Sequence, residues 1–504
     1  MQGTRQRLGA AIAAAALGLA LAACSAGSGG NPTPTDSTKD ELSIGLVLEP
    51  TTLDFTTNDA ASAPQVLLDN VYEGLVKIAQ DGTIVPDLAS SWEVSSDNLT
   101  YTFHLVDNAV FTNGAKFTAD DAVFSINRTK TDWNSALTAA MAVVESATAT
   151  SPTELVVKLS KPSNDWLFRM TTRIGAMFSK SGVGDLASTP IGTGPYRLET
   201  WNRGDSIVLA RNDDYWGDAP HFSEITFKYF DDPTALNNAL LTGTINVVGT
   251  VQAPESLAQF TDNSDYTVIE GTTNGEVLLS FNNRSTPFQD LRVRQAVRLA
   301  IDHRALVDTC WAGHGTLIGS MVPPTDPWYE DRTGDYPFDP AKAKSLLQAA
   351  EPGGLTLRLR LPNVPYAQDC GRVVQSMLED VGVTVQTDTL EFPQWLTDVF
   401  NNHDYDMSIV AHVEPRDLGT VFGDPDYYPG YDNPELQTLL AEADAGTPEE
   451  QVADMKEAAK IISVDAASDW LFLLPNLIVA DKDITGLPQN AVGEAFDLSA
   501  LGRS

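Results

Sequence analysis

The chain has few of the groups from which catalytic and metal sites are usually built. It contains three cysteines and six histidines in 504 residues, and no two of these histidines have the spacing of metal ligands on one face of a helix. Gly-x-Ser-x-Gly, His-Glu-x-x-His and Cys-x-x-Cys motifs are missing, as is the Gly-Lys dipeptide of phosphate-binding loops. We therefore expect no cofactor, no resident metal and no ATP hydrolysis in this chain.

Positive charge and long apolar runs are also scarce. The 32 Lys and Arg residues face 68 Asp and Glu residues, which gives a formal net charge of -36. Nucleic acids are bound through clustered Lys and Arg, so the composition argues against such a partner. Beyond the N-terminal segment, no apolar run reaches the roughly 20 residues that span a bilayer. The 42% hydrophobic content is that of a folded globular protein, and the length suggests about two or three domains.

The N-terminal segment has the features of an export signal. Two arginines precede a short apolar stretch that ends in the small residues LALAACSAGSGG. Residues 1–23 are therefore predicted to be a lipoprotein signal peptide, because residues 21–24, Leu-Ala-Ala-Cys, resemble a bacterial lipobox with Cys24 as the acylated residue. Residues 24–41 are rich in Gly, Ser, Thr and Pro and predict a flexible tether. We expect a protein anchored by lipid to the outer face of the cell membrane, or in the periplasm; the alternative is a soluble secreted protein.

Two cysteines remain once Cys24 is assigned to the lipid. In an oxidising compartment an even pair is a candidate disulfide, so Cys310 and Cys370 are expected either to form a bridge or to remain as two buried free thiols.

Alternating and purely apolar runs that predict strands are scattered along the chain, with helical patterns between them. Thr118 and the pair Asp339-Pro340 stand where helices should begin, and Gly382 stands where one should end. This mixture predicts an α/β architecture in more than one lobe. Short strand-like pieces at residues 83–101 indicate a small β-rich subdomain, and longer helices at 291–474 indicate a separate lobe.

A polar cluster follows a short apolar run in DYDMSIVAHVEPRDLG, residues 404–419. The run at 407–411 predicts a buried strand. If the strand continues to Glu414, then His412 and Glu414 point to the same face, because alternate residues of a strand share a face. Pro415 offers no N–H group and should end the strand.

Arg416 and Asp417 then lie in the loop beyond the strand, where sites in α/β sheets often gather. The alternative is a structural ion pair of Arg416 with Glu414 or Asp417. A hydrolase with Glu414 and Asp417 as its carboxylate pair is a remote alternative, since nothing in the sequence indicates the carboxylate that a second lobe would have to supply.

Several stretches carry a family resemblance that covers nearly all of the predicted mature chain. They are TTLDF, DLASSWEVSSDNLTYTFHLVDNAVFTNGAKFTADDAVFSINR, PIGTGPYRLETWNRGDSIVLARNDDYWG, FNNRSTPFQDLRVRQAVRLAIDHRALV and FDPAKAKSLL, in this order. Together they resemble the extracytoplasmic solute-binding proteins of ABC importers, in the peptide- and nickel-binding class known as family 5.

The resemblance implies a two-lobed fold of the periplasmic-binding-protein type (type II, cluster C), with an extra β-rich subdomain in lobe I. The implied boundaries are 42–74, 186–285 and 476–504 for the core of lobe I, 75–185 for its extra subdomain, and 286–475 for lobe II.

The resemblance also implies that no reaction is catalysed. The protein would close on a peptide and present it to permease subunits in the membrane, with separate ATPase subunits, and we expect it to be a monomer. Peptides would pair their backbone with strand segments of both lobes. A metal chelate, an amino-acid conjugate or an oligosaccharide remains as an alternative ligand.

The matching positions give candidate ligand-binding residues. The loop EPTTLDF would supply the lobe I edge and the end of the predicted strand the lobe II edge, with an aromatic residue beside the ligand unless that residue belongs to the core. These candidates are Glu49, Pro50, Thr51 and Thr52, then Ala411, His412, Val413 and Glu414, and finally Trp395.

In peptide-binding members, an Asp just beyond the lobe II strand pairs with the α-ammonium of the peptide. Here Pro415 occupies that position and His412 replaces the aromatic residue common at the strand end. We therefore expect Glu414 or Asp417 to bind the ligand's amino group, with Arg416 also in the site.

Overall fold

The structure is a computed structural model, and it describes residues 40–57 and 60–504. The predicted signal peptide, Cys24 and nearly all of the predicted tether lie outside the described residues. Contacts between residues group the chain into two units, residues 1–38 and residues 39–504. Within the described ranges, no helix is both long and apolar enough to cross a membrane.

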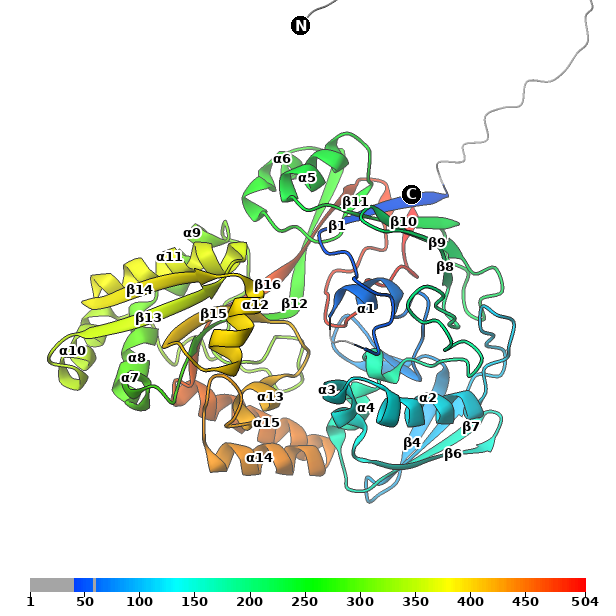
Figure 1. The fold of residues 1–504 in the computed structure, drawn as a ribbon, viewed down its shortest axis with the longest axis horizontal. Helices are drawn as coiled ribbons and strands as arrows, with labels where there is room; N and C mark the ends of the chain where they lie inside the picture. Colours follow the sequence, from blue (N-terminus) through cyan, green and yellow to red (C-terminus); the bar gives the residue numbers. More distant parts are fainter. Residues whose placement is uncertain (1–39, 58–59) are drawn as a thin grey trace, which may run out of the picture. The chain divides into compact units, whose positions relative to one another are not determined.

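A ten-stranded mixed sheet forms the framework (Figure 1). In order across the sheet, its strands are β14 (Val383–Leu390), β13 (Leu355–Pro362), β15 (Met407–His412), β12 (Tyr266–Phe281), β16 (Ser468–Asp481), β11 (Val247–Val248), β1 (Glu41–Leu46), β10 (Glu224–Tyr229), β9 (Ser206–Arg211) and β8 (Tyr196–Asn202). β13 pairs in parallel with β14 and β15, and β1 pairs in parallel with β10 and β11. The other neighbours are antiparallel.

The two long strands β12 and β16 run through both halves of this sheet (Figure 1). Residues near their lobe I ends, such as Ile478, pack in one hydrophobic core, whereas Val277 and Phe281 pack in a second core. We call the body around the first core lobe I and the body around the second core lobe II. Lobe II therefore begins earlier than the predicted residue 286, because a single continuous strand passes from one core to the other.

Lobe I carries a separate four-stranded antiparallel sheet covered by helix α2 (Ala119–Asp132) (Figure 1). Its strands are β4 (Ala89–Val94), β5 (Thr100–Leu105), β7 (Glu154–Leu159) and β6 (Val144–Ser151). Alternate residues of β5 and β7 are buried, as expected for a sheet with one covered face. The sheet is the β-rich subdomain that the pattern at 83–101 predicts. α2 begins at Thr118, whose N–H donates to the carboxylate of Asp121 at 3.0 Å.

Short elements complete lobe I. They are α1 (Ser62–Leu67), β2 (Val76–Ile78), β3 (Ile84–Pro86), α3 (Ser135–Thr138), α4 (Asn164–Arg169), α5 (Pro233–Leu241), α6 (Ala258–Thr261), β17 (Ile484–Thr485) and β18 (Gly502–Arg503), with 3-10 turns at Ala139–Met141, Arg173–Gly175 and Pro254–Ser256.

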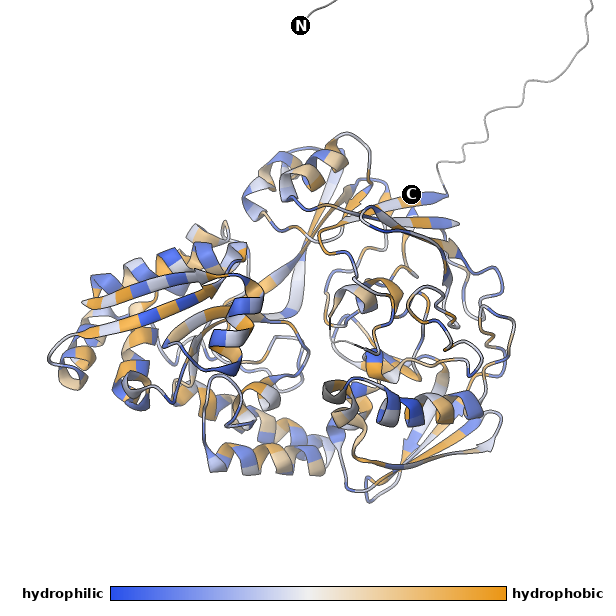
Figure 2. Ribbon diagram, in the orientation of Figure 1, coloured by the Kyte–Doolittle hydropathy of each residue, from blue (hydrophilic) through white to orange (hydrophobic). Residues whose placement is uncertain are grey.

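Helices of four to seventeen residues flank the lobe II part of the sheet. They are α7 (Thr286–Gln289), α8 (Leu291–Ala300), α9 (His303–Cys310), α10 (Pro340–Ala350), α11 (Pro365–Asp380), α12 (Phe392–Trp395), α13 (Leu418–Gly423), α14 (Pro434–Ala445) and α15 (Pro448–Val464), with a π-helical turn at Leu396–Asn401. The predicted start of α10 is confirmed, because Asp339 accepts a hydrogen bond from the N–H of Lys342 at 2.9 Å. α11 ends before Gly382, whose φ of +94° suits glycine. Hydrophobic and hydrophilic residues alternate along β13 (Figure 2).

A disulfide and a buried ion cluster join elements of lobe II. Cys310 at the end of α9 and Cys370 in α11 form a disulfide with their Cα atoms 4.9 Å apart. Asp469 on β16 is fully buried; its carboxylate lies 3.0 Å from His303 Nε2 and 3.2 Å from Arg298 Nε. The ion cluster therefore ties α8 and α9 to one of the two strands that connect the lobes.

Candidate functional site

The connection between the lobes contains an irregular segment of β12. Thr272 pairs with Pro475 and Glu276 pairs with Leu473, so the register shifts across residues 273–275. Side chains hold this irregular segment: Thr273 Oγ1 donates to the carbonyl of Leu474 at 2.7 Å and accepts from the N–H of Gly275 at 2.9 Å. We call residues 273–275 the hinge segment.

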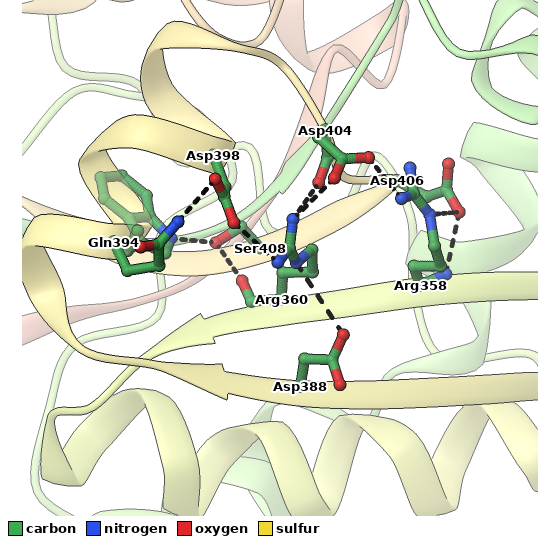
Figure 3. A network of polar contacts seen from close by, with 9 residues as sticks. Arg358, Arg360, Asp388, Gln394, Asp398, Asp404, Asp406 and Ser408 are labelled. Atoms are coloured by element: carbon green, nitrogen blue, oxygen red, sulfur yellow. Dashed lines mark hydrogen bonds and ion pairs between the residues drawn. The ribbon is translucent and has the colours of Figure 1, made fainter.

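A polar network holds the start of β15, at the end of the strand away from the hinge segment (Figure 3). Arg360 on β13 binds Asp398 at 3.0 Å and Asp404 at 2.9 Å. The backbone N–H of Arg358 donates to Asp406 Oδ2 at 2.9 Å. These contacts fix the segment that leads into β15, and with it the position of the residues at the strand's far end.

Trp395 packs beside β15 and forms a hydrogen bond with it. Its side chain is 2% exposed, and its indole N–H donates to Ser408 Oγ at 2.9 Å. It also packs against Tyr428 with ring centroids 6.0 Å apart. The structure thus gives Trp395 the packing of a core residue, which is the alternative to the predicted contact with a ligand, and its polar group is already bonded.

β15 ends at His412, two residues before the predicted end at Glu414. The pair Glu276 and His412 is the last one between β12 and β15, because the hinge segment follows on the partner strand. Val413 and Glu414 are exposed, and Arg416 has a φ of +58°. His412 and Glu414 are therefore not alternate residues of one strand, and the prediction that they share a face on that basis was wrong.

His412 is a neutral, hydrogen-bonded residue. Its Nε2 lies 2.9 Å from the hydroxyl of Tyr428, and the two rings are stacked 5.8 Å apart. Its Nδ1 lies 3.6 Å from Asp417 Oδ2. Burial lowers the pKa of His412 to about 4. At neutral pH, His412 therefore brings no positive charge to Asp417.

Two buried carboxyl groups lie beside this histidine, and we call Asp417 and Glu276 the hinge carboxyls. Asp417 is 4% exposed, and its pKa is raised first by burial and then by Glu414 and Asp326. Glu276 is 2% exposed, and its pKa is raised by burial and then by Asp417. Sequence reasoning missed Glu276; the available signal was a single acidic residue at the start of the apolar run EVLLSF.

Arg416 lies between the lobes, as part of the predicted site. Its guanidinium lies 3.8 Å from the ring centroid of Phe168 in lobe I and 4.8 Å from that of Trp328 in lobe II. Its Nε is 3.7 Å from Asp326 Oδ1. Arg416 also lines a cavity of about 220 Å³ between α4 and helices α13 to α15.

A second set of contacts joins the start of α4 in lobe I to the end of α14 in lobe II. Asp444 Oδ1 accepts from Ser163 Oγ at 2.7 Å and from the N–H of Asp165 at 3.1 Å. Asn164 Nδ2 donates to the carbonyl of Gly446 at 2.9 Å. We call this group the α4–α14 contact.

The polar groups of the predicted lobe I edge form hydrogen bonds with other groups of lobe I. Glu49 Oε1 accepts from the indole N–H of Trp201 at 2.8 Å and from the N–H of Gly204 at 3.0 Å. Thr52 Oγ1 accepts from the N–H of Asp54 at 3.2 Å. The exposed Thr51 offers its carbonyl to Arg203 at 3.2 Å.

The remaining lobe II candidate, Ala411, donates its backbone N–H to the hydroxyl of Tyr366 at 3.0 Å. The hydroxyl of Tyr366 therefore already accepts a hydrogen bond from this backbone N–H near the end of β15. Across the described ranges, no group of three or more His, Cys, Asp or Glu side chains has an arrangement that could hold a metal ion.

Comparisons with known proteins point to one family. Residues 83–435 match the profile of the "Bacterial extracellular solute-binding proteins, family 5 Middle". A dipeptide-binding protein of Escherichia coli K12 is 28% identical over 375 residues, which cover 68% of this chain and 69% of that protein. These matches agree with the resemblance drawn from the sequence motifs.

Solved structures share the fold. A periplasmic binding protein of Helicobacter pylori in complex with the peptide STSA superposes with a TM-score of 0.77 at 22% identity, covering 92% of this chain and 98% of that one. NikZ of Campylobacter jejuni in complex with Ni(L-His) also superposes with a TM-score of 0.77, at 21% identity over 92% of this chain and all of that one (100%). The chain has the two-lobed α/β fold of type II periplasmic binding proteins.

Proposed function

This chain belongs to the bacterial extracellular solute-binding proteins of family 5, and on that basis we propose that it captures peptides between its two lobes and presents them to the permease of an ABC importer. Proteins of this family are solute-binding components of transporters. The observation that carries the ligand assignment is Asp417, a carboxyl group that is 4% exposed and lies just beyond β15. A neutral histidine lies 3.6 Å from it, and Arg169 lowers its pKa by less than burial, Glu414 and Asp326 raise it.

A peptide's α-ammonium group would satisfy Asp417. A charge-assisted hydrogen bond in a site closed to water is stronger than one at an exposed surface. Asp417 is a better candidate for this contact than Glu414, because Glu414 is exposed. The peptide backbone would continue along residues 412–413, beyond the Ala411 N–H that Tyr366 already binds, where β15 ends beside the hinge segment.

The remaining assignments follow from the sequence motifs and the family. We propose that Cys24 carries the lipid anchor, that the protein works on the outer side of the cell membrane as a monomer, and that it catalyses no reaction. Membrane permease subunits and separate ATPase subunits would be its partners. The disulfide between Cys310 and Cys370 supports an oxidising compartment.

Closure of the lobes gives a direct test of ligand capture. We expect a pool of tripeptides to reduce the radius of gyration of the ligand-free full-length protein in small-angle scattering, because a ligand shifts the equilibrium only by contacting the closed form better than the open form. Native mass spectrometry of freshly purified protein should show peptide masses bound to it. A protein that binds Ni(L-His) or an oligosaccharide, and is unaffected by the peptide pool, would contradict the peptide assignment.

The α4–α14 contact should favour the closed form. Asp444→Ala removes the acceptor of two hydrogen bonds between the lobes, so we expect peptide affinity to fall about tenfold. Glu442→Ala changes an exposed residue of the same helix and should leave the affinity unchanged. Calorimetric titration measures both variants. Equal affinity of Asp444→Ala and the parent protein would show that this contact does not contribute to closure.

A further inference from the structure

Glu276 occupies a special place in the fold. It is the first paired residue after the hinge segment, and it lies directly opposite His412 in the last pair between β12 and β15. Side chains of directly opposed residues in an antiparallel pair lie on the same face, with their Cβ atoms about 5 Å apart. Glu276, His412 and the neighbouring Asp417 therefore gather where the lobes connect.

The carboxyl group of Glu276 is incompletely satisfied. The residue is 2% exposed, and among the described residues its Oε2 has no hydrogen-bond partner. A buried carboxylate oxygen without a donor is destabilising, so burial favours the protonated form of this group unless a donor or a cation reaches it. A neighbouring side chain or a ligand could supply the cation.

The neighbouring charged groups do not supply such a cation. Asp417, from the loop after β15, and Asp326, from the loop between α9 and α10, both raise the pKa of Glu276, after burial itself. His412 on β15 is neutral, and the neighbour on β16 is the apolar Leu473.

The nearby arginines already face other carboxylates. Arg416 lies 3.7 Å from Asp326, and Arg169 on α4 binds Asp165 at 2.9 Å. Arg169 lowers the pKa of Asp417, but burial, Glu414 and Asp326 raise it more, and no cation offsets the burial of Glu276 among the described residues.

We propose that Glu276 determines ligand specificity: with Asp417 it receives one cationic group of the ligand, and a proton held by this pair leaves to solvent when the ligand binds. The proposal rests on the proposed ligand capture between the lobes and adds a residue and a ligand class to it. The suitable class is a ligand with an ammonium or guanidinium group. A ligand whose amine is acetylated could not replace the proton.

The exchange balances in charge and in protons. In the empty site one of the hinge carboxyls carries a proton; in the occupied site the ligand's cation takes its place, and the buffer takes up the proton. Because the raised pKa values keep this proton bound at a pH where the unfolded chain has lost it, the stability of the ligand-free protein should fall as pH rises above the ordinary pKa of Glu, about 4.3.

Calorimetry can count this proton. A tripeptide selected from the pool is titrated at about pH 6, where its amino group, with an ordinary pKa of about 7.7 to 8.0, is fully protonated. In buffers of different ionisation enthalpy, the heat of binding to the parent protein should reveal proton release. Glu276→Gln should bind more than about tenfold more weakly and release fewer protons. Glu93→Gln, on an exposed position of β4, should behave as the parent protein.

Three outcomes are distinct. Peptide binding with unchanged affinity and proton release in Glu276→Gln overturns this inference and leaves the proposed function standing. No binding of any peptide by the parent protein overturns the proposed function itself. Weaker binding of Glu276→Gln with unchanged proton release would leave Glu276 as a contact residue and overturn the exchange.

Thermal unfolding of the ligand-free proteins gives a readout that does not depend on the peptide. Glutamine resembles a protonated glutamic acid, so Glu276→Gln should match the parent protein at about pH 5 and be more stable than it at about pH 8. A variant that is less stable at both pH values would show that Glu276 serves the fold and not an exchangeable proton.

Discussion

Replacing Asp417 by asparagine is expected to weaken the binding of a peptide with a free amino terminus by about 2 to 5 kcal/mol, on the order of thirtyfold or more in Kd. Asp417 is 4% exposed and lies beside a neutral His412, so the ligand's ammonium would be its main cationic partner. Asparagine keeps the shape of the side chain and removes its charge. Isothermal titration of the ligand-free variant with a selected tripeptide measures the change.

Two variants make this result specific. Glu414→Gln removes the exposed carboxylate three residues earlier and should cost much less affinity, because exposed charges are well screened. Asp426→Asn changes a fully exposed carboxylate of the same lobe and should have no effect. A larger loss in Glu414→Gln than in Asp417→Asn would assign the amino-group contact to Glu414 instead.

Asp469→Ala should lower the free energy of unfolding by about 3 to 5 kcal/mol, because it leaves the buried Arg298 without its counter-charge. Arg298 is 3% exposed, and its Nη1 also donates to the carbonyl of Ser463 at 2.7 Å, so it cannot move to water without breaking lobe II packing. Chemical denaturation of the ligand-free protein, with the disulfide intact, measures the loss.

The pH dependence of this ion cluster has a defined sign. Burial alone would raise the pKa of Asp469, but His303 and Arg298 lower it overall. The stabilisation is therefore present above the ordinary pKa of Asp, about 3.9, and is lost as pH falls through the lower folded-state value. Asp290→Ala, which removes the partly exposed partner of Arg292 and a helix cap, should cost only about 1 kcal/mol. Equal losses in both variants would contradict the role of the buried cluster.

Local signals in the sequence account for much of the fold. Thr118 and Asp339 begin helices as predicted, because a side-chain oxygen that satisfies the first free N–H groups acts within a few residues. The alternation that marks β13 is equally local. The two-lobed architecture came from motifs distributed over the whole chain, and the fold comparisons agree with it.

The hinge could not be read from the sequence, because strand register depends on partners far apart in the chain. Glu276 acquires its significance only from pairing with His412 and Leu473, which lie well over a hundred residues away in the sequence. For the same reason, the sequence did not show that β15 ends at His412 and does not reach Glu414. The predicted start of lobe II at residue 286 was too late in the sequence, because β12 contributes residues to both hydrophobic cores.

The predicted site residues differ in their surroundings in the structure. Asp417 and Arg416 lie near the lobe junction, as the motif implied, and their roles in binding remain predictions. Trp395 lies in a hydrophobic core, and Glu49 bonds to Trp201 within lobe I. Residue type alone could not separate these cases, because a tryptophan or a glutamate suits both a binding site and an internal contact.

Titration of the ligand-free full-length protein with one tripeptide pool in two forms, with free and with acetylated amino termini, tests the central claim most directly. If the hinge carboxyls capture the amino end of a peptide between the lobes, the free pool should bind and the acetylated pool should not. Equal binding of both pools, or binding of neither, would contradict the account.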